Sequence, residues 1–353
     1  MFLENLVREN IKRLTPYSSA RKEFSGTAQI FLDANENSFG SPLEQNYNRY
    51  PDPLQTEIKI KIAELNDVKP NEIFIGNGSD EAIDLLFRIF CEPKKDNILI
   101  CPPTYGMYEV SAEINDVEIK RANLTEDFQL DFDAINKAVD KNTKLIFVCS
   151  PNNPTGNAHP KFEISNLAKA FGGIVVVDEA YIHFSRENSS VSEINNLPNL
   201  VVLQTFSKAW GLAGLRVGLA FAGEETIKLF NKVKPPYNVS QIAQETILKA
   251  LKNQLKVQKT IIEIILEREK LVGNLQELFF VKKIYPSDAN FILVKTTDAN
   301  SIYRFLLGEK IVVRNRNNIE LCEGCLRITI GTPEENQILL KCFKKYETTN
   351  AHR

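Results

Sequence analysis

The sequence predicts an α/β protein with a large domain, built on a mostly parallel central sheet covered by helices, and a smaller C-terminal α/β domain. From about Glu72 onward, short runs rich in β-branched residues alternate with helical patterns, as they do in successive βαβ units. The strand-like runs are apolar throughout, which suits a sheet that is buried on both faces. After Pro235 and Pro236 the pattern changes to long helical stretches and a second set of strands, which predicts a separate, smaller unit.

Six apolar runs are expected to form the strands of the large domain. EIFIG leads through a Gly-Ser turn into a helix, and NILIC leads through the PPTYGMY loop into another. KLIFVCS ends at the turn-rich PNNPTGN, and the helical pattern KFEISNLAKAF precedes the next strand. The expected strands cover residues 72–76, 97–101, 144–150, 172–180, 200–205 and 215–222.

The smaller domain begins within the helical stretches that follow the paired prolines. The second stretch, from about Gln254 to Phe280, repeats apolar residues mostly every three or four positions, as an amphipathic helix does. Strands are expected near ANFILVK, EKIVVR and LRITIG, with a helix between the first two and a last helix at the end. We therefore expect an N-terminal arm over residues 1–45, a large domain over 46–245 and a small domain over 246–353.

Composition and charge exclude several classes of protein. The 43 basic and 45 acidic residues give a net charge of -2, so no basic surplus favours nucleic acid. The charged N-terminus MFLENLVRENIKRL is unlike a secretory signal, and no apolar run approaches the roughly 18 residues of a membrane helix. Cys322 and Cys325 form a lone CxxC without a second pair or a nearby histidine, so no metal site is expected. The expected compartment is the cytoplasm.

The segment TFSKAWGLAGLRVG, residues 205–218, carries the most informative chemistry. Thr205 and Ser207 place hydroxyls beside Lys208, and Arg216 follows eight residues after the lysine. Hydroxyls, small residues and an arginine can together hold a phosphate group. Partial withdrawal from water makes a lysine amine easier to deprotonate, which Schiff-base chemistry requires. Taken alone, a lysine is usually a solvated surface charge, and it is these neighbouring residues that favour a functional role for Lys208.

Three other segments place polar groups at the ends of expected strands. In GNGSDEAI, Ser79 can cap a helix whose first N–H groups favour an anion, provided that the carboxylate of Asp80 turns away. In VVVDEAY, Asp178 lies at the carboxyl edge of the sheet, where α/β proteins bind ligands, and Tyr181 follows three residues later. In SPNNPTGN, Asn153 offers an amide donor. Each segment could also be an ordinary cap, turn or loop.

Six segments in order, GNGSDE, PPTYGMY, SPNNPTG, VVDEAY, TFSKAWGLAGLRVG and LRITIG, resemble the fold-type I family of pyridoxal-phosphate aminotransferases. They span residues 76–331. The resemblance implies that Lys208 binds pyridoxal 5'-phosphate covalently and moves the reacting proton, and that Asp178 pairs with the ring nitrogen. It also implies contacts to the cofactor ring from Tyr105, Asn153 and Tyr181, and contacts to its phosphate from Ser79, Asp80, Thr205, Ser207 and Arg216.

The N-terminal segments LVRENIKRLTPYSSARKE, FLDANENSFG and NRYPDP resemble the histidinol-phosphate branch of this family. The resemblance implies a homodimer in which Tyr50 reaches the cofactor phosphate of the neighbouring subunit, and Tyr17 closes over the substrate. Arg327 in LRITIG matches the arginine that binds substrate carboxylates, and Arg314 in IVVRNR matches a second arginine typical of the branch. Because an arginine fork fits carboxylate and phosphate oxygens alike, this pair suits an enzyme with two different substrates.

The resemblance implies that the protein converts L-histidinol phosphate and 2-oxoglutarate into imidazole-acetol phosphate and L-glutamate, in histidine biosynthesis. An aromatic-amino-acid aminotransferase and a threonine-phosphate decarboxylase on the same fold are the alternatives. The sequence departs from the family pattern at Ser38, where proline is frequent, and at His183, where an acidic residue is common. No catalytic role is expected for His183, because Lys208 already supplies the acid-base chemistry. No motif identifies the residues that contact the imidazole.

Overall fold

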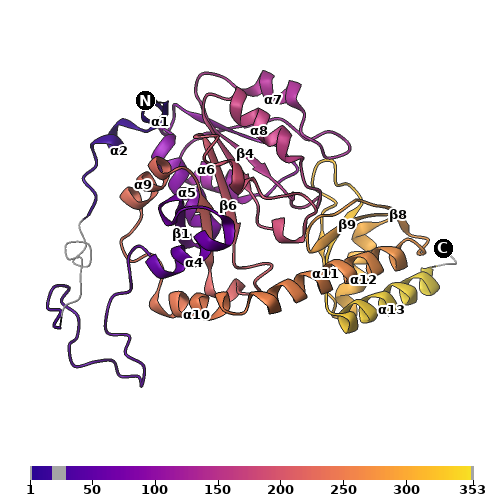
Figure 1. Cartoon of the computed structure of the whole chain (residues 1–353). Coiled ribbons are helices and arrows are strands. Elements are labelled where there is room, and N and C mark those ends of the chain that lie inside the picture. The colour runs from indigo at the N-terminus through magenta and orange to yellow at the C-terminus, as the bar shows by residue number, and fades with distance from the viewer. Residues whose placement is uncertain (1, 18–28, 351–353) are drawn as a thin grey trace.

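The computed structural model describes residues 2–17 and 29–350, and two sheets define its architecture (Figure 1). The larger sheet has seven strands in the order β1-β7-β6-β5-β4-β2-β3, and the smaller has four in the order β10-β11-β9-β8. The long helix α11 (Gln254–Leu275) follows α10 (Gln241–Leu251) and leads from the large unit to the small one (Figure 1). The predicted fold class, a mostly parallel large sheet with a smaller α/β unit, is confirmed.

The strands of the large sheet match the apolar runs in the sequence, and most are parallel. Strands β2 to β6 run parallel to one another, whereas β7 is antiparallel to both β1 and β6. The edge strand β3 was not expected, because its four residues, EIKR, are largely charged and partly exposed. The strands are β1 (Ile73–Asn77), β2 (Asn97–Ile100), β3 (Glu118–Arg121), β4 (Thr143–Cys149), β5 (Ile174–Asp178), β6 (Leu200–Thr205) and β7 (Val217–Phe221).

Helices cover both faces of the large sheet, as its apolar strands require. Val175 and Val177 of β5 belong to one core cluster, and the alternate residues Ile174 and Val176 belong to another. The first cluster is closed by α4 (Thr56–Asn66), α7 (Phe132–Ala138), α8 (Lys161–Ala170) and α10. The second is closed by α5 (Gly78–Phe90), α6 (Met107–Ile114) and α9 (Glu224–Val233). Short 3-10 helices are η1 (Pro70–Glu72), η2 (Ile182–Phe184), η3 (Ser190–Glu193) and η4 (Ala213–Leu215).

The small sheet is antiparallel. One of its faces packs against helices, and the other faces the large unit. Ile292, Val294 and Leu326 lie in a core with α11, α12 (Ala299–Gly308) and α13 (Pro333–Asn350). Leu293 and Cys325, on the opposite face, belong to a core cluster of the large sheet. The strands are β8 (Val281–Ile284), β9 (Phe291–Thr296), β10 (Arg314–Asn315) and β11 (Cys325–Thr329).

Two expected elements of the small unit are shorter in the structure. The helix expected to reach residue 280 ends at Leu275, and the chain then turns so that Leu278 and Phe280 also enter the core. The strand expected over 309–314 begins only at Arg314, because a turn with Lys310 at a φ of 63° follows α12. The domain boundaries at residues 46 and 246 stay predictions.

The two described N-terminal segments, residues 2–17 and the residues from 29 to α4, differ in whether they pack against the large unit. Helices α1 (Phe2–Leu6) and α2 (Glu9–Arg13) lie against the large unit, where Val7 and Ile11 are buried. Residues 29–55 form an extended segment that lies away from the two sheets and leads into α4 (Figure 1). Within residues 2–17 and 29–350, no helix has the length and apolar character required to cross a membrane.

Candidate active site

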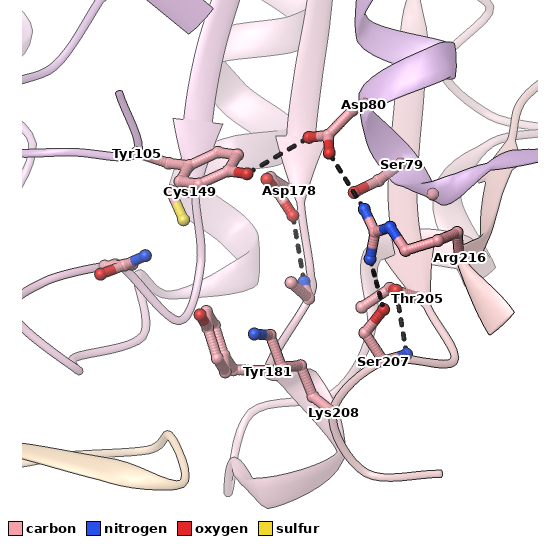
Figure 2. A pocket seen from close by; sticks show the side chains of 13 residues that line it. Ser79, Asp80, Tyr105, Cys149, Asp178, Tyr181, Thr205, Ser207, Lys208 and Arg216 are labelled. Carbon is pink, nitrogen blue, oxygen red and sulfur yellow. Dashed lines mark hydrogen bonds and ion pairs between the residues drawn. The ribbon is translucent and has the colours of Figure 1, made fainter. Parts of the chain in front are cut away.

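A cavity opens at the carboxyl ends of β4, β5 and β6, beside the first turn of α5 (Figure 2). Parallel strands end at the same edge of a sheet, so polar residues at their ends converge there. The cavity brings together ten residues that the sequence predicted for the site, with Gly78, Cys149 and Ala180 in addition. The ten are Ser79, Asp80, Tyr105, Asn153, Asp178, Tyr181, Thr205, Ser207, Lys208 and Arg216.

One wall of the cavity is suited to a phosphate group. The 13-residue helix α5 begins at Gly78, so the free N–H groups of its first turn lie at this wall. Arg216 donates to the hydroxyl of Ser207 at 3.5 Å and to the carboxylate of Asp80 at 3.3 Å. The hydroxyl of Tyr105 also donates to Asp80, at 3.2 Å. The Asp80 carboxylate is thus held by Arg216 and Tyr105, beside the wall that a phosphate would share.

Two glycines make this wall possible. A Cβ atom on Gly218 of β7 would overlap the backbone nitrogen of Ser79, so only glycine lets β7 approach the start of α5. Gly78 has a φ of 71°, and a Cβ atom there would lie 2.9 Å from the guanidinium of Arg216. Both contacts concern the wall where the helix N-terminus and Arg216 meet. A small anionic group therefore fits there without competition from protein side chains at these two positions.

Lys208 and Tyr181 lie beside each other in the cavity (Figure 2). The Lys208 amine is 5.6 Å from the centre of the Tyr181 ring. Partial burial lowers the pKa of Lys208, and the positive charges of Arg327 and Arg216 lower it further, whereas Asp178 opposes the shift. The surroundings therefore favour a neutral, nucleophilic amine more than water does.

Asp178, the last residue of β5, is a buried carboxylate with only 3% of its surface exposed. Its Oδ1 atom accepts from the Ala180 N–H at 3.1 Å, and its Oδ2 atom accepts from the Tyr108 hydroxyl at 2.8 Å. Burial raises the pKa of Asp178 to about 6, and the two hydrogen bonds limit that rise. A buried carboxylate with a raised pKa gains stability from a cation placed beside it, such as a protonated ring nitrogen.

The small unit contributes Arg327 to the site. Its guanidinium donates to the side-chain oxygen of Asn153 and lies over the ring of Phe291, 5.1 Å from the ring centre. The Tyr181 ring meets the same Phe291 edge to face, with 5.1 Å between the ring centres. Residues of both units thus meet at the mouth of the cavity.

Three arginines occupy one face of the small sheet. Arg314 pairs directly with Arg327 across β10 and β11, and Arg316 follows two residues later, which places it on the same face. The Nε atoms of Arg316 and Arg327 are buried without a hydrogen-bond partner among the described residues. No ion pair joins these three arginines to a carboxylate in residues 2–17 and 29–350. Such an uncompensated positive cluster suits an anionic ligand.

Four predicted site residues do not line the cavity in this single chain: Arg314 and Arg327 on the small sheet, and Tyr17 and Tyr50 in the N-terminal segments. Tyr17 is 74% exposed, and Tyr50 is 50% exposed and stacks on Tyr237 with 4.4 Å between the ring centres. His183 lies in η2 and faces a different cavity, on the side of Trp210.

Sequence reasoning missed Tyr108 and Arg316. For Tyr108 the spacing in PPTYGMY gave no signal, because Tyr105 precedes α6 and only Tyr108 lies in that helix. The alternation in IVVRNR was a signal that Arg316 shares a strand face with Arg314. Cys322 and Cys325 are buried free thiols, and no cluster of metal-binding side chains occurs in the part of the chain that the structure describes.

Comparisons with known proteins identify the family of this chain. The family model for aminotransferase class I and II matches residues 29–343. A histidinol-phosphate aminotransferase from Cytophaga hutchinsonii is 52% identical over 344 residues, which cover 98% of this chain and 99% of the relative.

Solved structures share the fold. The histidinol-phosphate aminotransferase from Clostridium acetobutylicum superposes with a TM-score of 0.79 at 25% identity, over 86% of this chain and 92% of that one. The histidinol-phosphate aminotransferase from Sinorhizobium meliloti, in complex with pyridoxal-5'-phosphate, gives a TM-score of 0.78 at 22% identity, over 89% and 90% of the two chains. The chain belongs to the class I and II aminotransferase family, in its histidinol-phosphate aminotransferase branch.

Proposed function

We propose that this protein transfers the amino group of L-histidinol phosphate to 2-oxoglutarate, giving imidazole-acetol phosphate and L-glutamate in histidine biosynthesis. The observation that carries the proposal is a cavity that joins Lys208 and Asp178 to a phosphate-binding wall, with the arginine cluster at its mouth. The 52% identity to a histidinol-phosphate aminotransferase over nearly the whole chain supports histidinol phosphate as the substrate in preference to phenylalanine or threonine phosphate.

Pyridoxal 5'-phosphate is the cofactor, and the cavity fits it. Asp178 would pair with the ring nitrogen, because its raised pKa makes a neighbouring cation favourable. Asn153 and Tyr181 would bind the ring's phenolic oxygen, and Tyr105 would lie against the ring face. The N–H groups of Ser79 and Asp80 and the side chains of Thr205, Ser207 and Arg216 would hold the phosphate. The bound cofactor supplies an electron sink that stabilises negative charge at the substrate's α-carbon.

Lys208 is the proposed catalytic acid and base as well as the residue that holds the cofactor. Because its pKa is lowered, a larger fraction of the amine is neutral and can accept the proton from the substrate's α-carbon. The protonated amine would then deliver that proton to the C4′ position. Tyr181 lies beside the amine and limits the access of water on that side.

The arginines on the small sheet are proposed to bind the anionic ends of both substrates. Glutamate and 2-oxoglutarate carry carboxylates, whereas histidinol phosphate carries a phosphate and no carboxylate. Arg327 and Arg314 can serve each in turn, because a guanidinium donates paired hydrogen bonds to either group. Tyr17 is proposed to close over the bound substrate.

We also propose that the protein acts as a cytoplasmic homodimer. The extended segment before α4 exposes several large apolar side chains, among them Ile30, Leu32 and Phe39, which a second copy could bury. Tyr50, on the same segment, is proposed to reach the cofactor phosphate of the neighbouring subunit. No nucleic-acid or membrane partner is proposed.

A single-turnover absorbance experiment tests the proposed function. The protein is loaded with cofactor, and L-histidinol phosphate, L-glutamate, L-phenylalanine or L-threonine phosphate is added separately while the cofactor's visible band is followed. Rapid conversion by both histidinol phosphate and glutamate is expected, and Lys208→Ala should remove both reactions. A reaction with phenylalanine but not with histidinol phosphate would identify an aromatic-amino-acid aminotransferase instead. Release of carbon dioxide from threonine phosphate would identify a decarboxylase.

A further inference from the structure

Tyr108 is a fully buried tyrosine whose hydroxyl has a defined partner. It lies in the first turn of α6, exposes none of its surface, and donates to Oδ2 of Asp178 at 2.8 Å. Its ring stacks on Phe147, with 4.6 Å between ring centres and 17° between planes, and meets the edge of Tyr105 at 5.5 Å. This packing fixes the ring, so the position of the hydroxyl is set by the core and not by the cavity.

Packing alone does not explain why this residue is a tyrosine and not a phenylalanine. A phenylalanine would fill the same space between Phe147 and Tyr105, and a buried hydroxyl without a partner would be destabilising. The bond to Asp178 therefore accounts for a tyrosine at this position. It also occupies the carboxylate oxygen that the Ala180 N–H leaves open, so the carboxylate is held from two sides.

We propose that Tyr108 is a positioning residue that fixes the orientation of the Asp178 carboxylate and keeps it ionised for a cationic ring nitrogen. This inference rests on the proposed function, because it assigns Tyr108 a part in binding the cofactor of that reaction. Tyr108 does not line the cavity, so it would act through Asp178.

Several titratable groups face Asp178 from the surrounding elements. Asp80 opposes its ionisation through charge repulsion, and Lys208 favours it. The Tyr108 hydroxyl and the Ala180 N–H are the hydrogen-bond donors that the structure gives to the carboxylate. Without Tyr108, only the Ala180 N–H and the charge of Lys208 would offset burial, and the pKa of Asp178 would rise above about 6. The other groups near Asp178 are Cys149 on β4, Tyr105 before α6 and Tyr181 after β5.

The test compares Tyr108→Phe with Tyr285→Phe, which removes the hydroxyl of another buried tyrosine, one whose ring packs on Phe128 of the large unit. Infrared difference spectra of the cofactor-free proteins follow the carboxylic-acid band of Asp178 through a pH titration, and Asp178→Asn identifies the band. A rise of about one pKa unit or more is expected in Tyr108→Phe, since a hydrogen bond to a charged group contributes that much. No shift is expected in Tyr285→Phe.

A second measurement follows cofactor binding. The dissociation constant of pyridoxal phosphate, measured between pH 6 and pH 9, should be about fivefold larger in Tyr108→Phe near pH 6 and about twofold larger near pH 7, and it should approach the unsubstituted value at higher pH. An unchanged Asp178 titration together with an unchanged pH dependence of binding would overturn the proposal, whatever happens to stability. These readouts need no amino-acid substrate, so they stand even if histidinol phosphate proves not to react.

Discussion

Replacing Asp178 with asparagine should stabilise the cofactor-free protein while it removes activity. Asp178 is buried, and its pKa is raised to about 6 from the ordinary value of 3.8. The unfolded chain therefore loses this proton more readily than the folded one. Stability associated with the protonated form is fully present below pH 4 and is lost as the pH rises toward 6 and beyond. Asparagine cannot ionise, so the variant should escape this loss.

The magnitude follows from the two pKa values. A difference of about 2.2 units corresponds to about 3 kcal/mol at pH 8, and to about 1.5 kcal/mol at pH 5 where the group is only partly affected. The asparagine amide keeps one acceptor, and the Tyr108 hydroxyl can rotate to accept from the amide nitrogen, so little of the gain is lost. For 353 residues, 3 kcal/mol corresponds to a rise in Tm of about 4 °C.

The assay is thermal unfolding of the cofactor-free protein at pH 5 and pH 8, followed by circular dichroism. Asp133→Asn, which changes an exposed aspartate on α7, is the matched control and should leave Tm unchanged at both pH values. The Tm gain of Asp178→Asn should be about twice as large at pH 8 as at pH 5. An equal gain at both pH values, or a loss at pH 8, would refute the argument that ionised Asp178 destabilises the folded, cofactor-free protein.

Three further substitutions test other parts of the site. Lys208→Ala should abolish turnover and leave the circular dichroism spectrum intact; measurable turnover would end the assignment of the catalytic amine. Arg316→Gln should weaken glutamate binding about tenfold, the value of one hydrogen bond to a charged group, and an unchanged dissociation constant would exclude Arg316 from the anion site. Gly218→Ala should weaken cofactor binding and lower Tm, because its Cβ would overlap the start of α5, whereas Gly214→Ala has open space and should do neither.

The sequence predicted the strands that are apolar and missed those that are not. Strands β4 and β5 consist of apolar runs buried on both faces, and such runs have few other stable arrangements. Strands β3 and β8, with sequences EIKR and VKKI, lie at sheet edges, and at least half of the residues in each are charged. Their pairing depends on the neighbouring strand more than on their own residues, so a pattern search does not find them.

The site was predictable to the extent that it is local to strand ends. Asp178 ends β5, and Lys208 follows β6 by three residues, so the parallel order of these strands brings the two side chains together. Tyr108 was missed because its role depends on how α6 packs over β4. The sequence places Tyr108 in a helix but does not say which residue of the sheet lies beside it.

Contacts within one chain do not place Tyr17 and Tyr50 in the site. Their roles were inferred from motifs, and in the isolated chain both lie exposed on segments that leave the large unit. Large apolar side chains exposed to water raise the free energy of the protein unless another surface covers them. Phe39 is fully exposed, and no described residue of this chain covers it. Ten site residues lie at strand ends and in loops, where the fold of one chain positions them. Tyr17 and Tyr50 would need a second copy to hold them in place, so neither the sequence pattern nor packing within one chain positions them.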